Sequence, residues 1–195
     1  YNFVANYFGG SGNDLVLVRA AARAFAWGDN TFGQIGDNSK TQRNAPVAVN
    51  VAAGTALQGK TVMGLANGGS HSLALCSDGT VAAWGYNYDG ELGTNSIAQT
   101  KVPVAVSTAA GVSSLFGKTV VAMTAGELHS MALGADGTVS AWGSNYNGQL
   151  GNGTTTDSLV PVAVSSAAGV SALAGKTVTA IRAGRAHNLA LCSDG

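Results

Sequence analysis

The run His129-Ser-Met-Ala-Leu-Gly-Ala-Asp-Gly-Thr-Val-Ser-Ala-Trp142 decides the fold of this 195-residue chain. Its segments 129–133 and 138–142 have the alternation and the β-branched content of short strands. Asp136-Gly137 lies between them, and this dipeptide suits a tight turn that needs positive φ. The run therefore predicts a β-hairpin.

Two more strands are predicted around this hairpin. Residues 118–124 (Lys-Thr-Val-Val-Ala-Met-Thr) precede it, and residues 160–164 (Val-Pro-Val-Ala-Val) follow it after a glycine-rich loop. Pro161 cannot donate to a strand ladder, so the last strand belongs at a sheet edge. Four antiparallel strands with an edge strand at one end are typical of a propeller blade, so we predict an all-β propeller.

The same pattern recurs along the chain. An Ala-Trp-Gly motif returns after 57 and then 58 residues, at Trp27, Trp84 and Trp142. A histidine returns every 58 residues, at His71, His129 and His187. We divide the chain into a divergent first blade (1–49), a second (60–106), a third (118–164) and half of a fourth (176–195). In the first blade, residues 3–8 and 13–18 are expected to be the first two strands.

Composition excludes several classes of partner. Charged residues are 10% of the chain, against about a quarter in typical globular proteins, and the ten basic and ten acidic residues cancel. A neutral chain lacks the field that nucleic-acid and anionic-membrane binders use. No run approaches the roughly 20 apolar residues of a membrane span. We therefore predict no nucleic-acid partner and no membrane insertion.

The repeated motifs resemble a known family. Ala-Gly-x-x-His-Ser-x-Ala-Leu, Asp-Gly-Thr-Val, Ala-Trp-Gly-x-Asn-x-x-Gly-Gln-Leu-Gly and Pro-Val-Ala-Val are similar to the regulator-of-chromosome-condensation repeat. The resemblance implies blades that close into a seven-blade ring. About three and a half blades cannot close such a ring alone, so further blades from missing sequence or another chain are expected. The near-identical, alanine-rich copies also predict a bacterial source.

The period exceeds the one that the resemblance implies, and the excess lies in the inserts 51–59, 108–117 and 166–175. We expect these inserts to fold back as a small lid, with a short helical turn as one alternative. Their large apolar residues would form that lid: Leu57, Leu115, Phe116 and Leu173.

The activity is left open by the resemblance, which implies nucleotide exchange on a small GTPase, chromatin binding or enzyme inhibition. The repeated residues account for turns and packing only. No Ser/His/Asp, Cys/His or paired-carboxylate grouping is brought together by the blade geometry, so we predict neither an enzyme nor a cofactor.

Some residues have a functional and a structural interpretation. Residues 9–17 fit a calcium-binding nonapeptide with Asp14 as a ligand, but a plain glycine hairpin is the alternative that we favour. The histidines could ring the propeller axis as metal ligands, or be buried hydrogen-bonding groups, which we favour. Cys76 and Cys192 would lie two blades apart, too far for a disulfide. The tryptophans could bind sugars, although packing between blades is favoured.

Positions that differ between the copies are the candidate binding residues. They lie before the histidines, before the prolines and after the tryptophans, at Glu127, Arg185, Arg43, Lys101, Tyr88 and Tyr146. We predict that these loops bind a protein or a glycan on one face, with simple solvation as the alternative.

The predicted function is a non-enzymatic binding or architectural propeller module of a larger protein. That protein is expected to be bacterial, and to be secreted or at the cell surface. The alternative is a protein-binding regulator that resembles a GTPase exchange factor or an enzyme inhibitor.

Overall fold

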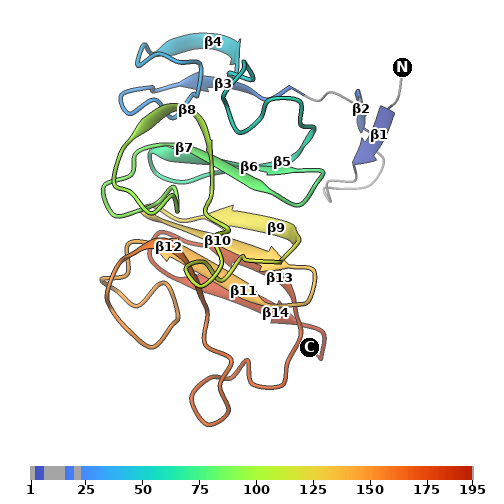
Figure 1. Ribbon diagram of the computed structural model, residues 1–195, viewed down its shortest axis with the longest axis vertical. Helices are drawn as coiled ribbons and strands as arrows, with labels where there is room; N and C mark the ends of the chain where they lie inside the picture. Colours follow the sequence, from blue (N-terminus) through green and yellow to red (C-terminus); the bar gives the residue numbers. More distant parts are fainter. Residues whose placement is uncertain (1–2, 7–15, 20–22, 195) are drawn as a thin grey trace.

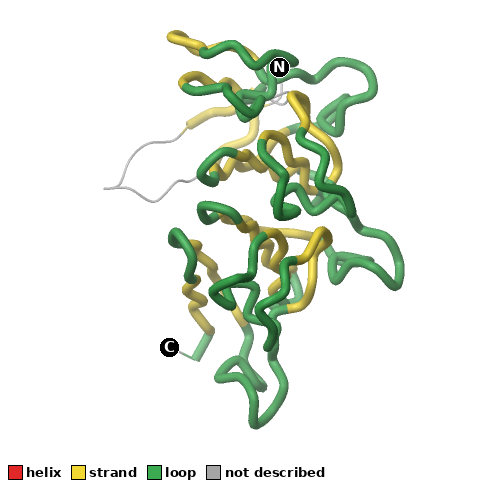
Figure 2. The backbone as a smooth tube through the Cα atoms, turned by 90° about the vertical axis from the view of Figure 1, so that its left-hand side faces the viewer, coloured by secondary structure: helices red, strands yellow, loops and turns green. Residues whose placement is uncertain are grey.

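A computed structural model describes residues 3–6, 16–19 and 23–194, and every regular element within these ranges is a β-strand (Figures 1 and 2). The inserts expected to carry a short helical turn form hydrogen-bonded turns instead. Among the described residues no helix could cross a membrane. The prediction of an all-β fold is confirmed.

Two complete four-stranded antiparallel sheets occupy the middle of the molecule. The first contains β5 (Val62–Asn67), β6 (His71–Cys76), β7 (Val81–Gly85) and β8 (Thr100–Ala105). The second contains β9 (Val120–Ala125), β10 (His129–Gly134), β11 (Val139–Gly143) and β12 (Ser158–Ala163). Each is one blade, with its strands hydrogen-bonded in sequence order.

The predictions of a glycine turn and of edge strands with proline are confirmed within these blades. Gly137 has a φ of 80° in the turn between β10 and β11, where the Gly134 amide donates to the Thr138 carbonyl. Pro103 and Pro161 lie in β8 and β12, which are edge strands of their sheets. A proline at an edge leaves no ladder bond unmade.

Shorter sheets flank the two blades. β3 (Phe25–Gly28) pairs with β4 (Arg43–Ala48), and β13 (Val178–Ala183) pairs with β14 (Asn188–Cys192). β1 (Phe3–Asn6) and β2 (Val16–Arg19) form a third two-stranded sheet, separate from β3 and β4. Residues 1–49 therefore do not form one four-stranded sheet in the described chain, and their division as a single blade stays a prediction.

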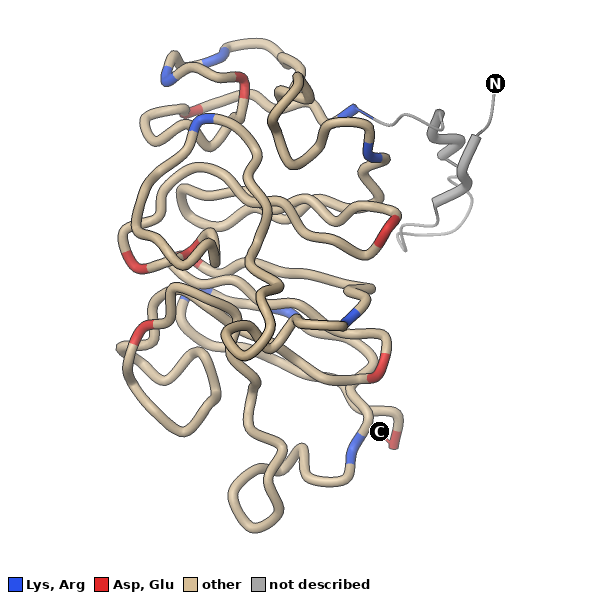
Figure 3. The backbone as a smooth tube through the Cα atoms, in the orientation of Figure 1, with Lys and Arg blue, Asp and Glu red and all other residues tan. Residues whose placement is uncertain are grey.

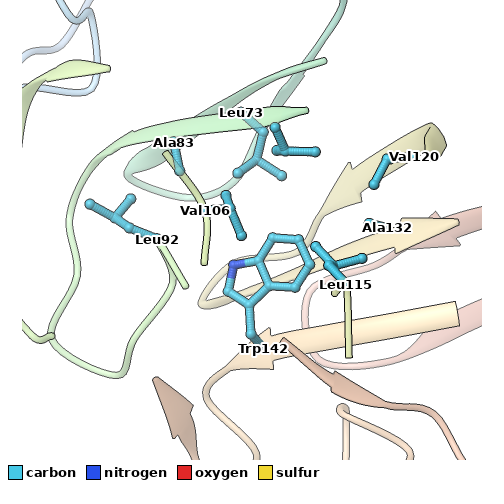
Figure 4. Close-up of a cluster of buried hydrophobic side chains, with 9 residues drawn as sticks. Leu73, Ala83, Leu92, Val106, Leu115, Val120, Ala132 and Trp142 are labelled. Carbon is cyan, nitrogen blue, oxygen red and sulfur yellow. The ribbon is translucent and has the colours of Figure 1, made fainter. Parts of the chain in front are cut away.

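The core lies between the blades rather than within one of them. Trp142 from β11 packs on Leu73 and Ala83 of the preceding blade and on Val120 and Ala132 of its own (Figure 4). Trp84 occupies the corresponding place one blade earlier, against Ala24 and Val49. The predicted packing of tryptophans between blades is confirmed for these two.

The inserts fold back onto the blades. Leu57 and Leu115 are buried, and Leu173 is half-buried. The Ala56 amide donates to the carbonyl of Pro103 at 2.9 Å, which ties the insert to the edge strand β8. Phe116, in contrast, is exposed, so its predicted place in the lid is wrong. Its neighbour Leu115 takes the buried position instead.

Candidate functional site

A carbonyl between neighbouring blades organises the scaffold under the candidate site. The Glu91 carbonyl accepts hydrogen bonds from Ser130 Oγ and Trp142 Nε1, both at 2.8 Å. The same arrangement, also at 2.8 Å, joins the Gln34 carbonyl to Ser72 and Trp84. The repeated tryptophan is thus held by a hydrogen bond as well as by packing.

The repeated histidines extend this network. His71 Nε2 lies 2.9 Å from Ser130 Oγ, and His129 Nε2 lies 2.7 Å from Asn188 Oδ1. Because the Ser130 hydroxyl donates to Glu91, its oxygen accepts from His71. Burial lowers the pKa of His71 to about 3 and also lowers the pKa of His129, so both are neutral near pH 7.

The favoured interpretation of buried, hydrogen-bonding histidines is confirmed for His71 and His129, whereas His187 is exposed. Within the ranges that the structure describes, no group of three or more His, Cys, Asp or Glu residues could hold a metal ion. Cys76 and Cys192 are free thiols, as predicted. Asp14, the calcium candidate, lies outside the described residues.

Two sets of loops meet at one end of the blades. The loops before the histidines join β5 to β6 and β9 to β10, and the loops after the tryptophans join β7 to β8 and β11 to β12. The Tyr86 amide donates to the Ser70 carbonyl at 2.9 Å, and the Ser144 amide to the Leu128 carbonyl at 2.8 Å. We call this end the tryptophan-loop face.

Aromatic side chains form a row on this face. Phe32 and Tyr86 meet edge to face with 5.0 Å between ring centroids, and Tyr86 stacks with Tyr88 at 6.4 Å. Tyr88 is 67% exposed. A shallow pocket of about 310 Å³ adjoins the row, lined by Phe32, Gly69, Ser70, Tyr86, Glu127 and Leu128. Rigid aromatic groups beside a pocket are typical of protein-binding surfaces.

Charged groups flank the aromatic row. Arg185 Nε donates to Glu127 Oε2 at 2.5 Å, and this ion pair joins two neighbouring blades. The pair raises the pKa of Arg185. Charges are otherwise sparse and lie mostly in the loops at the ends of the strands (Figure 3). Exposed ion pairs stabilise a fold little, and a role of Glu127 and Arg185 in binding stays a prediction.

The other predicted binding residues differ from one another in their surroundings. Arg43 is paired with the nearly buried Asp37 at 2.5 Å, so it supports its own loop. Lys101 is exposed, and its carbonyl accepts from the Asn38 amide at 3.0 Å. Tyr146 is exposed at the position that matches Tyr88 one blade later. Their role in binding stays a prediction.

Glu91 is a notable residue that the sequence analysis missed. It is fully buried, where the equivalent residues of the other copies are Gln34 and Gln149. Its Oε2 accepts from the Asp89 amide at 3.0 Å, whereas Oε1 is buried without a hydrogen-bond partner. Burial raises its pKa to about 7. The signal was the glutamate at a loop position where the other two copies have glutamine.

The sequence of the chain matches a known family of repeats. The sequence model of the regulator of chromosome condensation (RCC1) repeat matches residues 22–75, 78–133 and 136–191. The chain belongs to the RCC1 repeat family. A second RCC1 repeat model matches residues 120–149. The resemblance inferred from the motifs is therefore confirmed.

The relatives of this RCC1-repeat chain are longer proteins, and the chain matches only part of each. It is 34% identical to human E3 ubiquitin-protein ligase HERC2 over 166 residues, which is 85% of this chain and 3% of HERC2. It is 29% identical to the Arabidopsis thaliana ultraviolet-B receptor UVR8 over 160 residues, 82% of this chain and 34% of the receptor. The chain thus spans about a third or less of these relatives.

Solved structures support the same architecture. Human WBSCR16 superimposes with a TM-score of 0.71 at 23% identity, over 91% of this chain and 42% of that one. Yeast RCC1 (Prp20), in its complex with Kap60, gives 0.70 at 18% identity, over 90% and 39%. At these identities the likeness concerns the fold, and it confirms a β-propeller.

The RCC1 repeats and the blades are out of phase. The first matched segment, 22–75, covers β3 to β6, and the second, 78–133, covers β7 to β10. Each complete blade therefore takes its first two strands from one repeat and its last two from the next. This interleaving joins consecutive repeats through strand ladders as well as through packing.

Proposed function

We propose that this chain is a non-enzymatic, protein-binding propeller module that engages its partner through the tryptophan-loop face. The observation that carries the proposal is the row of Phe32, Tyr86 and Tyr88 beside the pocket rimmed by Glu127. The contacts between blades do not depend on these side chains, because the indoles of Trp84 and Trp142 donate to carbonyls of the preceding loops and pack between the blades.

The composition of this face favours a polypeptide over a glycan or a nucleic acid. Exposed tyrosines next to a single acid–base pair supply apolar contact area together with directional polar groups. The net charge of zero offers no attraction for phosphates. A peptide segment with an apolar anchor and at least one charged group fits this chemistry.

Related solved structures support a protein as the class of partner. Yeast RCC1 (Prp20) is bound to Kap60 in one structure, and binding of Prp20p to Gsp1p and histones accompanies another. A regulator that resembles an exchange factor or an inhibitor is a narrower form of the same proposal. The bacterial source and the secreted or cell-surface location stay predictions.

A displayed library of random peptides tests the proposal directly. We expect enriched peptides whose affinity falls about tenfold or more with Tyr88→Ala, because exposed tyrosines often dominate binding energy. Phe116→Ala removes another exposed aromatic group, from an insert, and serves as the matched control. It should leave the affinity unchanged.

Two results would contradict the proposal. The first is a set of peptides that lose equal affinity with Tyr88→Ala and with the Phe116→Ala control. The second is the enrichment of no peptide while the same protein binds defined oligosaccharides on a glycan array.

A further inference from the structure

The loops of the two complete blades bring three acidic residues together on the tryptophan-loop face. Asp89 and Glu91 lie in the loop between β7 and β8, and Asp157 lies in the loop between β11 and β12. The Asn95 amide donates to the Leu159 carbonyl at 2.8 Å, which joins the first loop to the start of β12. We call Asp89, Glu91 and Asp157 the acidic triplet.

The acidic triplet is a local excess of negative charge. Burial and the charge of Asp157 raise the pKa of Asp89. Burial raises the pKa of Glu91 to about 7, and the charges of Asp89 and Asp157 act in the same direction. No described lysine or arginine forms an ion pair with the triplet, whereas every other described acid except Asp29 has such a pair. The described part of the chain therefore leaves this charge without a counter-charge.

The side chain of Glu91 presents an acceptor where another copy presents a donor. In all three copies one side-chain oxygen at this position accepts from a loop amide, at 3.0 Å for Glu91 and at 2.9 Å for Gln34 and Gln149. The second polar atom of Gln34 is Nε2, which donates to Asp29 Oδ2 at 2.8 Å. Glu91 is 0% exposed, and its second atom, Oε1, has no hydrogen-bond partner. A buried acceptor without a donor costs free energy, and a positive charge brought close to it offsets that cost.

Exposed tyrosines adjoin the acidic triplet in both loops. Tyr88 is 67% exposed and precedes Asp89. Tyr146 is 83% exposed and follows Asn145, whose amide donates to Asp157 Oδ1 at 2.6 Å. The faces of tyrosine rings attract cations, and the aliphatic stems of lysine and arginine pack on apolar surface. Acidic groups beside exposed tyrosines thus favour a cationic side chain over an anionic or a purely apolar one.

The acidic triplet is continuous with the aromatic row. Tyr86 belongs to the same loop as Asp89 and Glu91, and burial together with these two charges raises the pKa of its hydroxyl. Tyr86 also meets Phe32 and lines the pocket beside it. A polypeptide whose apolar side chain contacts the row can therefore place a neighbouring residue at the acidic triplet.

An organic cation fits these residues better than a metal ion does. Within the described ranges, no group of three or more His, Cys, Asp or Glu residues is placed to hold a metal ion in common. A guanidinium or an ammonium group needs no such common point. The guanidinium of arginine spreads five donors over a plane, and the ammonium of lysine carries three donors on a flexible stem.

We propose that the acidic triplet is the subsite for an arginine or lysine side chain of the polypeptide that binds the tryptophan-loop face. The cation would contact Asp89 and Asp157, which are half-buried and exposed, and its field would act on the buried Glu91. This inference rests on the proposed function, and it specifies the sign of the charge that the partner carries.

Titration with a defined cationic probe tests the proposal apart from any selected peptide. The probe is N-acetyl-arginine amide, and N-acetyl-glutamine amide is its neutral counterpart. We expect only the arginine probe to shift the amide resonances of residues 86–91 and 144–146 in nuclear magnetic resonance spectra of the isotope-labelled chain. Equal shifts with the two probes, no shift, or shifts confined to other residues would overturn the proposal.

Two substitutions that remove charge and keep the hydrogen bonds provide a matched comparison. Asp89→Asn combined with Asp157→Asn should weaken binding of the arginine probe about tenfold, because each exposed charge pair contributes modestly. Asp157→Asn keeps an oxygen that can accept from the Asn145 amide. Asp29→Asn is the control, because Asp29 is an exposed acid without an ion pair among the described residues and lies in the equivalent loop of the first copy. Equal effects of the control and the double substitution would overturn the proposal.

The pH dependence of probe binding tests the place of Glu91. The titratable groups around it are Asp89 and Tyr86 in its own loop, Asp157 in the next loop and His129 on β10. Glu91 has a pKa of about 7, whereas burial lowers the pKa of His129 and raises that of Tyr86 from 10.

A bound cation favours the ionised form of Glu91, so affinity for the arginine probe should rise about threefold from pH 6 to pH 8. Glu91→Gln should abolish this rise. An affinity that is independent of pH would overturn the proposal, as would a rise that the Glu91→Gln chain retains.

The displayed peptides separate this inference from the proposed function. Enriched peptides that depend on Tyr88 but carry no arginine or lysine, or that bind the double variant equally well, would overturn the subsite and leave the proposed function standing. Binding of the arginine probe at the acidic triplet without enrichment of any peptide would support the subsite and contradict the proposed function.

Discussion

The seam between the two complete blades and the open β3 edge contain the same Ala-Trp-Gly motif in different surroundings. At the seam, Trp142 is fully buried and donates to the Glu91 carbonyl. At the open edge, Trp27 is largely exposed beside a cavity. The difference shows that a repeat buries its tryptophan only with a neighbour, because most apolar contacts in repeat proteins lie between repeats.

The largest expected effect separates these two tryptophans. Trp142→Ala should destabilise the chain by about 3–5 kcal/mol, because it leaves a cavity in the seam and frees a buried carbonyl. Trp27→Ala should change the stability of the monomer by less than about 1 kcal/mol, since the side chain is mostly in water. Urea unfolding at low protein concentration measures both, and equal losses would contradict the comparison.

A second expected effect concerns the acid buried in the seam. The folded state favours the protonated form of Glu91, whose pKa is raised from 4.5 to about 7. The unfolded state binds fewer protons between these values, so stability should fall as the pH rises from 4.5 to 7. Glu91→Gln should therefore stabilise the chain by about 3 kcal/mol at pH 8 and by little at pH 4.5.

Gln149→Glu provides the matched control for that substitution. Gln149 is the buried equivalent of Glu91 in the next copy. The new carboxylate should destabilise the chain at pH 8 and be tolerated near pH 4.5, the inverse of Glu91→Gln. Thermal melting at the two pH values checks the pair, and a stabilisation by Glu91→Gln that does not depend on pH would exclude the buried charge as its cause.

A third expected effect compares two equivalent serines. Ser130→Ala should cost about 1–2 kcal/mol, because it removes the hydrogen bond to Glu91 and leaves the buried His71 Nε2 without its partner. Ser72→Ala removes the hydrogen bond to the Gln34 carbonyl but leaves no described histidine without a partner. Its loss of stability should therefore be smaller. Urea unfolding of both variants tests the order, and a reversed order would contradict the proposed network.

The smallest expected effect lies on the tryptophan-loop face. Glu127→Gln removes an exposed ion pair, so the melting temperature should stay unchanged within error. The affinity for peptides selected on this face should fall. A clear loss of thermal stability would instead place the Glu127–Arg185 pair in the scaffold between blades.

Much of the architecture was predictable because its signals are local. Asp136-Gly137 specified a turn, Pro161 specified an edge strand, and alternation placed β10 and β11 nearly to the residue. Phe116 was misplaced because composition does not say which of two adjacent apolar residues turns inward. Glu91 was overlooked because a repeat pattern draws attention to what matches.

The candidate site was predicted only in part. Glu127 and Arg185 were chosen because they differ between copies, and they do lie together on one face. Arg43 was chosen for the same reason, yet it pairs with Asp37 inside its own loop. The packing of Phe32 on Tyr86 joins two blades, and a sequence pattern within one repeat contains no information about such a contact.

The sequence by itself determined the strands, the turns and the period, because these depend on residues a few positions apart. The tertiary structure decided which tryptophans are buried and which loops share a face. Those properties depend on contacts between residues about one repeat apart, such as His71 with Ser130. The tryptophan of the same motif can therefore be buried at one blade and exposed at another, because its burial depends on the neighbouring repeat.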